Sequence, residues 1–270
     1  MTTTATAWRP AAEGRRAASA AGRVGFAARG FIYLLIGWLA IKIASGHRTH
    51  EANQRGALAD VAGQSFGLAL LWILAFGFAA YALWRFSEVA WGTATEGKKA
   101  GPRLQSLVRG LVYAGFCVST FLFIAGTKRS NQSKQQATLT ARVMRHSFGQ
   151  WLVGLVGLIV LIIGLSMIVK GVRRKFEKNL KMHELHGTTR TVVVWAGTIG
   201  VTARGIVFAI AGALVIDAAV TFDPKKSQGL DGALRTLAGQ PYGPLLLGIV
   251  AAGLIVFGLY GFALSRWGRT

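Results

Sequence analysis

Six long apolar runs, separated by polar segments, dominate the pattern of hydrophobic and polar positions along this chain. The runs cover residues 26–44, 66–84, 107–125, 148–169, 192–220 and 242–264. Each is about 19 residues or longer, and a helix rising about 1.5 Å per residue needs about 20 residues to cross about 30 Å of hydrocarbon. A surface helix of a soluble domain carries a polar face, which these runs lack. The pattern therefore predicts an all-α, polytopic membrane protein with six transmembrane helices.

Two short motifs recur in the same order three times along the chain. An Arg-Gly pair opens the first, third and fifth runs, with the arginines at Arg29, Arg109 and Arg204. Before the second and sixth runs, ALADVAGQSFG at 57–67 aligns with ALRTLAGQPYG at 233–243, whereas the middle copy, LTARVMRHSFG at 139–149, keeps little beyond its last three residues.

The spacing between the two motifs is nearly the same in every copy. It is measured from each arginine to the aromatic residue before the glycine, that is, from Arg29 to Phe66, from Arg109 to Phe148 and from Arg204 to Tyr242. So constant a spacing indicates one structural unit used three times. The residues of this repeat signature are Gln64, Phe66, Gly67, Phe148, Gly149, Gln240, Tyr242 and Gly243.

Each unit crosses the membrane twice, so every copy begins on the same side. The repeats are therefore parallel, related by an axis along the membrane normal, and we expect a six-helix bundle with rough threefold pseudosymmetry. The 35 glycines favour close helix packing, and pairs spaced four apart, such as Gly63 and Gly67, predict such a face. The predicted organisation is a flexible basic cytosolic tail at 1–21, repeat 1 at 22–92, a linker at 93–106, repeat 2 at 107–180, a linker at 181–190 and repeat 3 at 191–268.

The net charge of +21 bears on orientation and on partners. Twenty Lys and Arg residues lie on the side that carries both termini, against eleven on the opposite side. The positive-inside rule therefore places both termini in the cytoplasm. Because the basic residues lie between the runs and not in one polar domain, they predict contact with the bilayer and anionic lipid headgroups, and no nucleic acid. The single cysteine, Cys117, excludes an internal disulfide.

The repeated segments resemble a family of bacterial membrane proteins. The pattern A-L-x-x-[LV]-A-G-Q-[SP]-[FY]-G before a span, the A-R-G opening and YALWRFSEVAWG at 81–92 are similar to the family known as domain of unknown function 1206. The resemblance covers residues 20–268 and implies six spans in three two-span units, with no established activity. The middle copy departs from the pattern, because Arg145 and His146 stand where the other copies have glycine and glutamine.

Two motifs with a superficial likeness to catalytic sites occur in the wrong context. GTATEGKK, from Gly92 to Lys99, approaches a phosphate-binding loop, but a membrane span precedes it and Lys99 replaces the hydroxyl residue. HELH, from His183 to His186, spaces its histidines three apart, whereas a zinc-protease helix needs four. We therefore expect no enzyme, no metal site and no cofactor.

The three repeated arginines are the first candidate site. Each lies at the predicted cytosolic mouth of an odd-numbered span. If the pseudosymmetry brings Arg29, Arg109 and Arg204 together, they form a cationic ring that could hold a lipid phosphate or an anionic substrate. The alternative is that each arginine anchors its own helix in the headgroup region.

Five further ionisable or polar residues form two other candidate sites. Lys42 and Asp217 occupy the same position of the repeat, because each follows its arginine at the same interval. They could pair inside the membrane. Alternatively, each lies at the outer interface. Tyr81, Arg85 and Glu88 lie at the inner end of the second span. They form either a local i, i+3 ion pair or a docking surface for a partner protein.

These features support two functional hypotheses. The first is a non-catalytic accessory or scaffold protein of the inner membrane, associated with another membrane protein. The second is a small transporter or channel for an anion or lipid that uses Arg29, Arg109 and Arg204.

Overall fold

The computed structural model describes residues 9–47, 50–92, 100–126, 132–146 and 148–269, with side chains from residue 19 onward. These residues form α-helices, a few short 3-10 turns and no named strand. The α-helices are α1 (Arg9–Ala44), α2 (Gln54–Ala62), α3 (Gly67–Trp91), α4 (Ala100–Ile124), α5 (Gln132–Met144), α6 (Gly149–Val172), α7 (Gly187–Val220), α8 (Gly229–Ala238) and α9 (Gly243–Trp267).

Six of these helices are long and apolar enough to cross a membrane, as the sequence predicts: α1 from Ser19 onward, α3, α4, α6, α7 and α9. Their starts differ from the predicted boundaries. The tail predicted to be flexible at 1–21 is helical from Arg9, because alanine, the best helix former, dominates this segment; residues 1–8 lie outside the described part. Helices α4 and α7 likewise begin inside the two predicted linkers, at Ala100 and Gly187.

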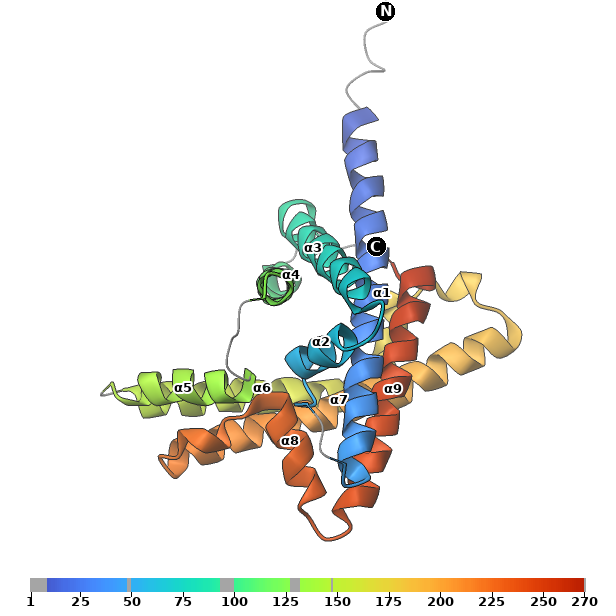
Figure 1. Cartoon of the computed structure of the whole chain (residues 1–270). Helices are drawn as coiled ribbons and strands as arrows, with labels where there is room; N and C mark the ends of the chain where they lie inside the picture. The colour runs from blue at the N-terminus through green and yellow to red at the C-terminus, as the bar shows by residue number, and fades with distance from the viewer. Residues whose placement is uncertain (1–8, 48–49, 93–99, 127–131, 147, 270) are drawn as a thin grey trace, which may run out of the picture.

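The three repeats are α1–α2–α3, α4–α5–α6 and α7–α8–α9, and they pack in a cycle. The first span of each repeat lies along the second span of the preceding repeat, so α4 packs on α3, α7 on α6, and α1 on α9. Figure 1 shows α1 and α9 side by side, with the α6/α7 pair lying across them. This order gives the bundle its rough threefold pseudosymmetry.

The glycine of each Arg-Gly pair permits this packing between repeats. A Cβ atom at Gly30 would lie 2.6 Å from the carbonyl oxygen of Gly258 on α9, and one at Gly205 would lie 2.8 Å from the backbone of α6. At Gly110 the neighbour is the ring of Phe86 on α3, 2.7 Å from the added atom. Lipid tails solvate apolar side chains as well as a helix does, so small residues that let backbones approach drive association. The Arg-Gly recurrence therefore encodes the cyclic contact.

Contacts within a repeat differ between the outer repeats and the middle one. In repeat 1, α1 packs on α3 through Ala28, whose Cβ occupies the space above Gly77. Repeat 3 has the same contact between Ala203 on α7 and Gly253 on α9. Both hairpins are closed by an alanine over a glycine.

Repeat 2 lacks this pair of small residues. Val108 precedes the arginine where the other repeats have alanine, and Ile159 stands at the position of the second span where the other repeats have Gly77 and Gly253. The side chains of Val108 and Ile159 are exposed, and α4 makes at most marginal contact with α6. The middle hairpin is therefore open, and each of its spans is held mainly by a neighbouring repeat.

A tight turn joins each short helix to the span that follows it. In every repeat the N–H of the signature glycine donates to the carbonyl oxygen three positions earlier, at 2.7–2.8 Å, in the pairs Gly67–Gln64, Gly149–His146 and Gly243–Gln240. A side chain at Gly67 would collide with the carbonyl of Val61. The expectation that Gly63 and Gly67 form a helix-packing face is therefore wrong, since Gly67 serves this turn.

The aromatic residue before each signature glycine projects from the protein. Phe66, Phe148 and Tyr242 are each 80% exposed, the same value in all three repeats. They lie where the second span begins, and aromatic rings at the ends of spans are typical of the membrane–water interface. We call this side of the protein, which carries α2, α5 and α8, the cap side, and the opposite one the terminus side.

Carboxylates join the cap-side segments of different repeats. Glu51 of repeat 1 accepts a hydrogen bond from the backbone N–H of Gln132, at the start of α5 in repeat 2, at 2.9 Å. Asp231 of repeat 3, which is buried, accepts one from the N–H of Ala52 in repeat 1 at 2.7 Å. Both bonds have a carboxylate acceptor, and hydrogen bonds to carboxylates are stronger than those between neutral groups.

The third connection on the cap side is weaker. The hydroxyl of Thr140 on α5 donates to the hydroxyl of Ser227, just before α8, at 3.0 Å. With the two carboxylate bonds it completes a ring of contacts from repeat 1 to 2, 2 to 3 and 3 to 1. The cap side is therefore closed around the axis, although the middle hairpin below it is open.

Candidate functional site

The three repeated arginines lie inside the spans and not at their mouths. Arg29, Arg109 and Arg204 each lie about four helical turns before the cap-side ends of α1, α4 and α7, which is about 23 Å along each helix. The helices also extend about two and a half turns or more beyond these arginines on the terminus side, which sequence reasoning did not anticipate. The arginines therefore lie well within the helical bundle.

Arg29 and Arg204 meet over one aromatic ring. Their guanidinium carbons are 4.8 and 5.1 Å from the centroid of Phe257 on α9. Because both guanidinium carbons lie within about 5 Å of the same ring centroid, they are at most about 10 Å from each other. Arg204 also stacks over Tyr33 at 5.2 Å and Phe208 at 4.9 Å. Aromatic faces therefore stabilise these two cations from three helices.

Arg109 completes the cluster from α4. It interacts electrostatically with Arg29, Arg204 and Arg85, and with Tyr81. Its side chain nevertheless remains exposed, whereas Arg29 and Arg204 are only partly accessible. We call Arg29, Arg109 and Arg204 the arginine centre. The structure thus brings together the three arginines that the sequence singled out.

An aromatic residue follows each of these arginines after one helical turn, a feature that our sequence reasoning missed. The three residues at this position are Tyr33, Tyr113 and Phe208. Positions i and i+4 share a helix face, so each aromatic side chain points to the same side as its arginine. The signal was present in the sequence as R-G-x-[IV]-[YF] in all three repeats.

The arginine centre has no carboxylate partner among the residues that the structure describes. The ion pairs found there involve other residues. The Nε atoms of Arg29 and Arg204 are also buried without a hydrogen-bond partner. A cation removed from water costs several kcal/mol unless an opposite charge compensates it. The Tyr81 hydroxyl hydrogen-bonds the Arg29 side chain, but the described residues provide no carboxylate for this concentration of positive charge.

Tyr81, Arg85 and Glu88 form a buried network next to the centre. Arg85 donates to Glu88 at 2.6 Å and to the Tyr81 hydroxyl at 2.7 Å, and Ser106 on α4 donates to Glu88 at 2.7 Å. All four residues are less than 9% exposed. The expected i, i+3 ion pair is present, but the docking surface is a wrong prediction because a partner could not reach these side chains. Glu88 neutralises Arg85 and joins α3 to α4.

Lys42 and Asp217 do not pair with each other. The Lys42 ammonium lies 3.8 Å from Asp60 on α2, and Asp217 lies 2.7 Å from the Lys226 ammonium. All four side chains are between 24% and 46% exposed, at the cap-side ends of their helices. The intramembrane pair is therefore a wrong prediction, because each residue pairs with a different partner near the cap-side end of its own helix.

The remaining motifs contribute no cluster to the described part of the chain. No group of three His, Cys, Asp or Glu residues there could hold a metal ion. His183 of the HELH segment is 75% exposed and lies 3.9 Å from Glu184. Most of the GTATEGKK segment, residues 93–99, lies outside the described residues.

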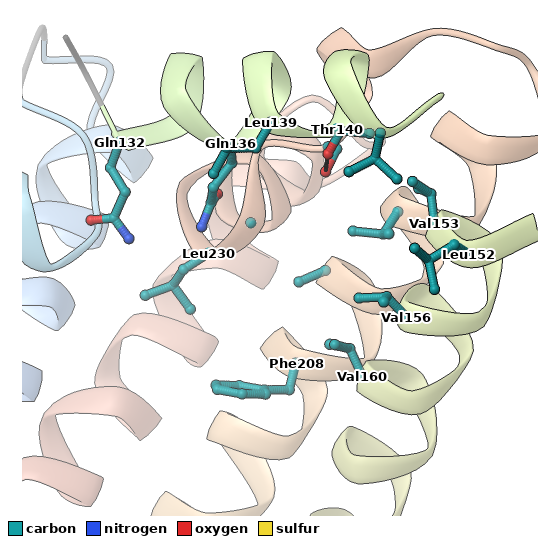
Figure 2. A pocket seen from close by; sticks show the side chains of 15 residues that line it. Gln132, Gln136, Leu139, Thr140, Leu152, Val153, Val156, Val160, Phe208 and Leu230 are labelled. Carbon is teal, nitrogen blue, oxygen red and sulfur yellow. Dashed lines mark hydrogen bonds between the residues drawn. The ribbon is translucent and has the colours of Figure 1, made fainter. Parts of the chain in front are cut away.

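A cavity of about 480 Å³ lies between the cap-side helices and the centre. Figure 2 shows α5 along one edge, with Gln132, Gln136 and Thr140, and Phe208 at the opposite end. The walls between them come mainly from valines and leucines of α6, α7 and α8. Because the Arg204 guanidinium stacks on Phe208, the deep end of the cavity adjoins the arginine centre.

Six spans in three cyclic repeats, surrounding arginines that have no carboxylate partner among the described residues, define a multi-pass α-helical membrane protein. The family described as Domain of Unknown Function (DUF1206) matches residues 24–92, 104–174 and 199–268, and the chain belongs to this family. The three matches coincide with the three repeats of the structure, which confirms the resemblance found in the sequence.

A relative with the same overall extent is the uncharacterized protein YxxB of Bacillus subtilis (strain 168). The two chains are 32% identical over 242 residues, which is 88% of this chain and 87% of the relative. No solved structure matches the chain.

Proposed function

We propose that this protein is a small membrane transporter whose arginine centre binds an oxyanion, a phosphate or carboxylate group, of its substrate. The observation that carries this proposal is the convergence of Arg29, Arg109 and Arg204 without a carboxylate partner in the described chain. Cation–π contacts with Phe257 and its neighbours contribute about 0.5–2 kcal/mol each, which leaves most of the desolvation cost unmet. An anion bound between the guanidinium groups would supply the missing charge.

Arginine suits this task better than lysine. Its planar guanidinium group presents several N–H donors in a fixed geometry and matches phosphate and carboxylate oxygens in pairs. Arg109 is the accessible member of the three and would meet the anion first. Arg29 and Arg204, already held on Phe257, provide the pre-organised part of the site.

The proposed orientation places the terminus side in the cytoplasm of a bacterial inner membrane. Basic residues are concentrated on that side, as in the segment after α6, where Arg173, Arg174 and Lys175 follow one another. Arg109 on α4 and Arg29 on the apolar part of α1, which begins at Ser19, lie closer to this side than to the cap side, whereas Arg204 lies midway along α7. The anion would therefore be captured from the cytoplasmic side or from the inner leaflet.

The surface expected to bind a partner under the accessory or scaffold hypothesis is not accessible. Tyr81, Arg85 and Glu88 are buried, and Glu88 already neutralises Arg85. The arginine centre, in contrast, supports a specific chemistry, and we therefore prefer the transporter.

A binding experiment with matched arginine variants tests this proposal. We would measure the thermal stability of the purified protein in detergent with increasing sodium phosphate, against sodium chloride at the same ionic strength. We expect phosphate to raise the melting temperature of the wild type and of Arg190→Gln, an exposed control on α7. Arg109→Gln should lose this stabilisation, because it removes the accessible cation.

A flux measurement in liposomes then distinguishes binding from transport. Arg204→Ala should lower phosphate-dependent anion flux at least about tenfold, the effect of losing one charge-assisted contact of about 1.5–3 kcal/mol. Asp217→Asn should leave it unchanged, since Asp217 pairs with Lys226 at the cap-side end of α7. Equal phosphate responses of the wild type and Arg109→Gln, or unchanged flux in Arg204→Ala, would contradict the proposal.

A further inference from the structure

The cavity above the arginine centre has one polar and one apolar end. Gln132, Gln136, Thr140 and Ser227 lie at its cap-side edge. From there to Phe208 its lining consists of aliphatic side chains such as Val156 and other valines and leucines. Its volume of about 480 Å³ lies within the range of about 300–1,000 Å³ that is typical of ligand sites. The lining favours an apolar ligand along most of its length.

The deep end of this cavity adjoins the cationic centre through one residue. Phe208 forms part of the cavity lining on one side, and the Arg204 guanidinium lies 4.9 Å from its ring centroid. Arg29 lies beyond Arg204, across Phe257. A molecule in the cavity could therefore place an anionic group at the arginines and an apolar chain along α6 and α7.

Helix α4 of the open middle hairpin does not cover this cavity. Helix α4 contributes no residue to the cavity lining, and it makes at most marginal contact with α6. In repeats 1 and 3 the equivalent spans close on each other through Ala28 and Ala203. A ligand can therefore approach from the bilayer between α4 and α6.

We propose that the substrate is an anionic lipid with a phosphate monoester headgroup. The headgroup binds at Arg29, Arg109 and Arg204, and one acyl chain occupies the cavity. This proposal rests on the oxyanion site proposed above and adds the chemical class of the molecule that carries the anion.

Charge and shape together favour this lipid class. A phosphate monoester carries a charge of about −1.5 to −2 near pH 7, which is closer to the charge of three guanidinium groups than the single charge of a phosphodiester. A soluble anion would leave the aliphatic walls of the cavity empty. A zwitterionic lipid would fill the cavity but add a cation beside the arginines.

The test compares free phosphate with monoacyl phosphates of increasing chain length. Binding of inorganic phosphate, and of lysophosphatidic acids with 8, 10 or 12 chain carbons, is measured by thermal shift at one detergent concentration. The same chain lengths of lysophosphatidylcholine control for detergent-like effects. Arg109→Gln is included in every series, so that the headgroup site and the chain site are tested separately.

Two tryptophan variants on α6 test the cavity. Val156→Trp places a bulky ring on the lining, whereas Leu155→Trp, the matched control, changes a neighbouring exposed residue outside that lining. Val160→Trp, one turn further along the lining, provides an independent second variant.

We expect the 12-carbon lysophosphatidic acid to bind the wild type at least about tenfold more tightly than inorganic phosphate, because each buried methylene is worth a severalfold gain. Val156→Trp and Val160→Trp should remove this gain and leave phosphate binding unchanged, and Leu155→Trp should alter neither. If phosphate binding depends on Arg109 but chain length has no effect, or both cavity variants behave like Leu155→Trp, the lipid proposal is wrong while the oxyanion site stands. If phosphate binding does not depend on Arg109, both proposals are wrong.

Discussion

The middle repeat differs from the two outer repeats in how its spans are held. In the most apolar part of each span, 50–56% of the residues are buried in repeat 1 and 39–50% in repeat 3, but only 11% of α4 and 17% of α6. The outer repeats are hairpins that close on themselves. The spans of the middle repeat are attached to neighbours instead, α4 to α3 and α6 to α7.

The difference can be traced to two positions in each repeat. An alanine over a glycine closes the outer hairpins, as at Ala203 and Gly253. Val108 and Ile159 at the same positions keep the middle spans apart, because β-branched side chains prevent close approach of two backbones. The same repeated unit therefore forms a closed hairpin where these two positions hold alanine and glycine, and an open one where they hold larger residues.

The middle repeat compensates through its contact with repeat 3. Gly157, Gly164 and Gly171 are spaced seven apart on α6, and a Cβ atom added at any of them would lie no more than 3.0 Å from the backbone of α7. This stripe of small residues, from Gly157 to Gly171, makes the α6/α7 pair the most extensive contact in the described bundle. Helix α6 is thus held firmly on α7, and the cavity runs beside this contact, lined by Val153 and Val160 of α6 and by Phe208 of α7.

The largest effect is expected from a bulky residue in a closed hairpin. Gly253→Val should destabilise the protein by about 3 kcal/mol or more, because its Cβ collides with Ala203 and overpacking of this kind forces backbone shifts. Ile159→Val, at the equivalent position of the open hairpin, should change stability by less than about 0.5 kcal/mol. Thermal unfolding in one detergent measures both. A similar loss in the two variants would show that the middle hairpin is closed as well.

The cap-side connections give the next largest effect. Asp231→Ala removes a buried charged acceptor and leaves the N–H of Ala52 unpaired, at an expected cost of about 2–3 kcal/mol. Thr140→Val, which breaks the hydroxyl contact between repeats 2 and 3, should cost about 1 kcal/mol or less. The same unfolding measurement applies, and equal losses would show that the connection between repeats 2 and 3 is not the weaker one.

Accessibility of the arginine centre provides a third comparison. In a Cys117→Ser background, Arg109→Cys should react with a maleimide at least about tenfold faster than Arg204→Cys, since Arg109 is exposed and Arg204 stacks against three rings. Labelling followed by mass spectrometry gives the two rates. Equal rates would mean that the open hairpin does not give access to the centre.

The fold is predictable from the sequence to the extent that it depends on local properties. The length of an apolar run and the interval between recurring motifs are properties of short segments, and both predict the six spans and three repeats correctly. The helix before Ser19 escapes such reasoning because its charge favours a flexible tail, although alanine dominates its composition. The open hairpin is visible as Val108 and Ile159 only once the contact that they disrupt is known.

In the candidate site, too, features of the local sequence are predictable and contacts across the bundle are not. The arginines are identifiable because they recur, and the aromatic residue four positions later can be identified in the same way. Partners across the bundle are not predictable, because they depend on how the spans rotate. Lys42 therefore pairs with Asp60 and not with Asp217, and Arg85 points inward on a span whose sequence is apolar on every side.

The smallest effect is expected where the three repeats are alike. Phe66, Phe148 and Tyr242 are equally exposed at the start of the second span, in closed and open repeats alike. If each ring anchors its span in the interface, replacing any one by serine should cost about 0.5 kcal/mol, and the three costs should agree. The cost should also be larger in lipid nanodiscs than in detergent, because only the bilayer has a fixed interface. A distinctly larger cost for Phe148→Ser would mean that this ring packs against other residues of the open repeat. The aromatic residue would then stabilise the open hairpin itself and would not act only as an interfacial anchor.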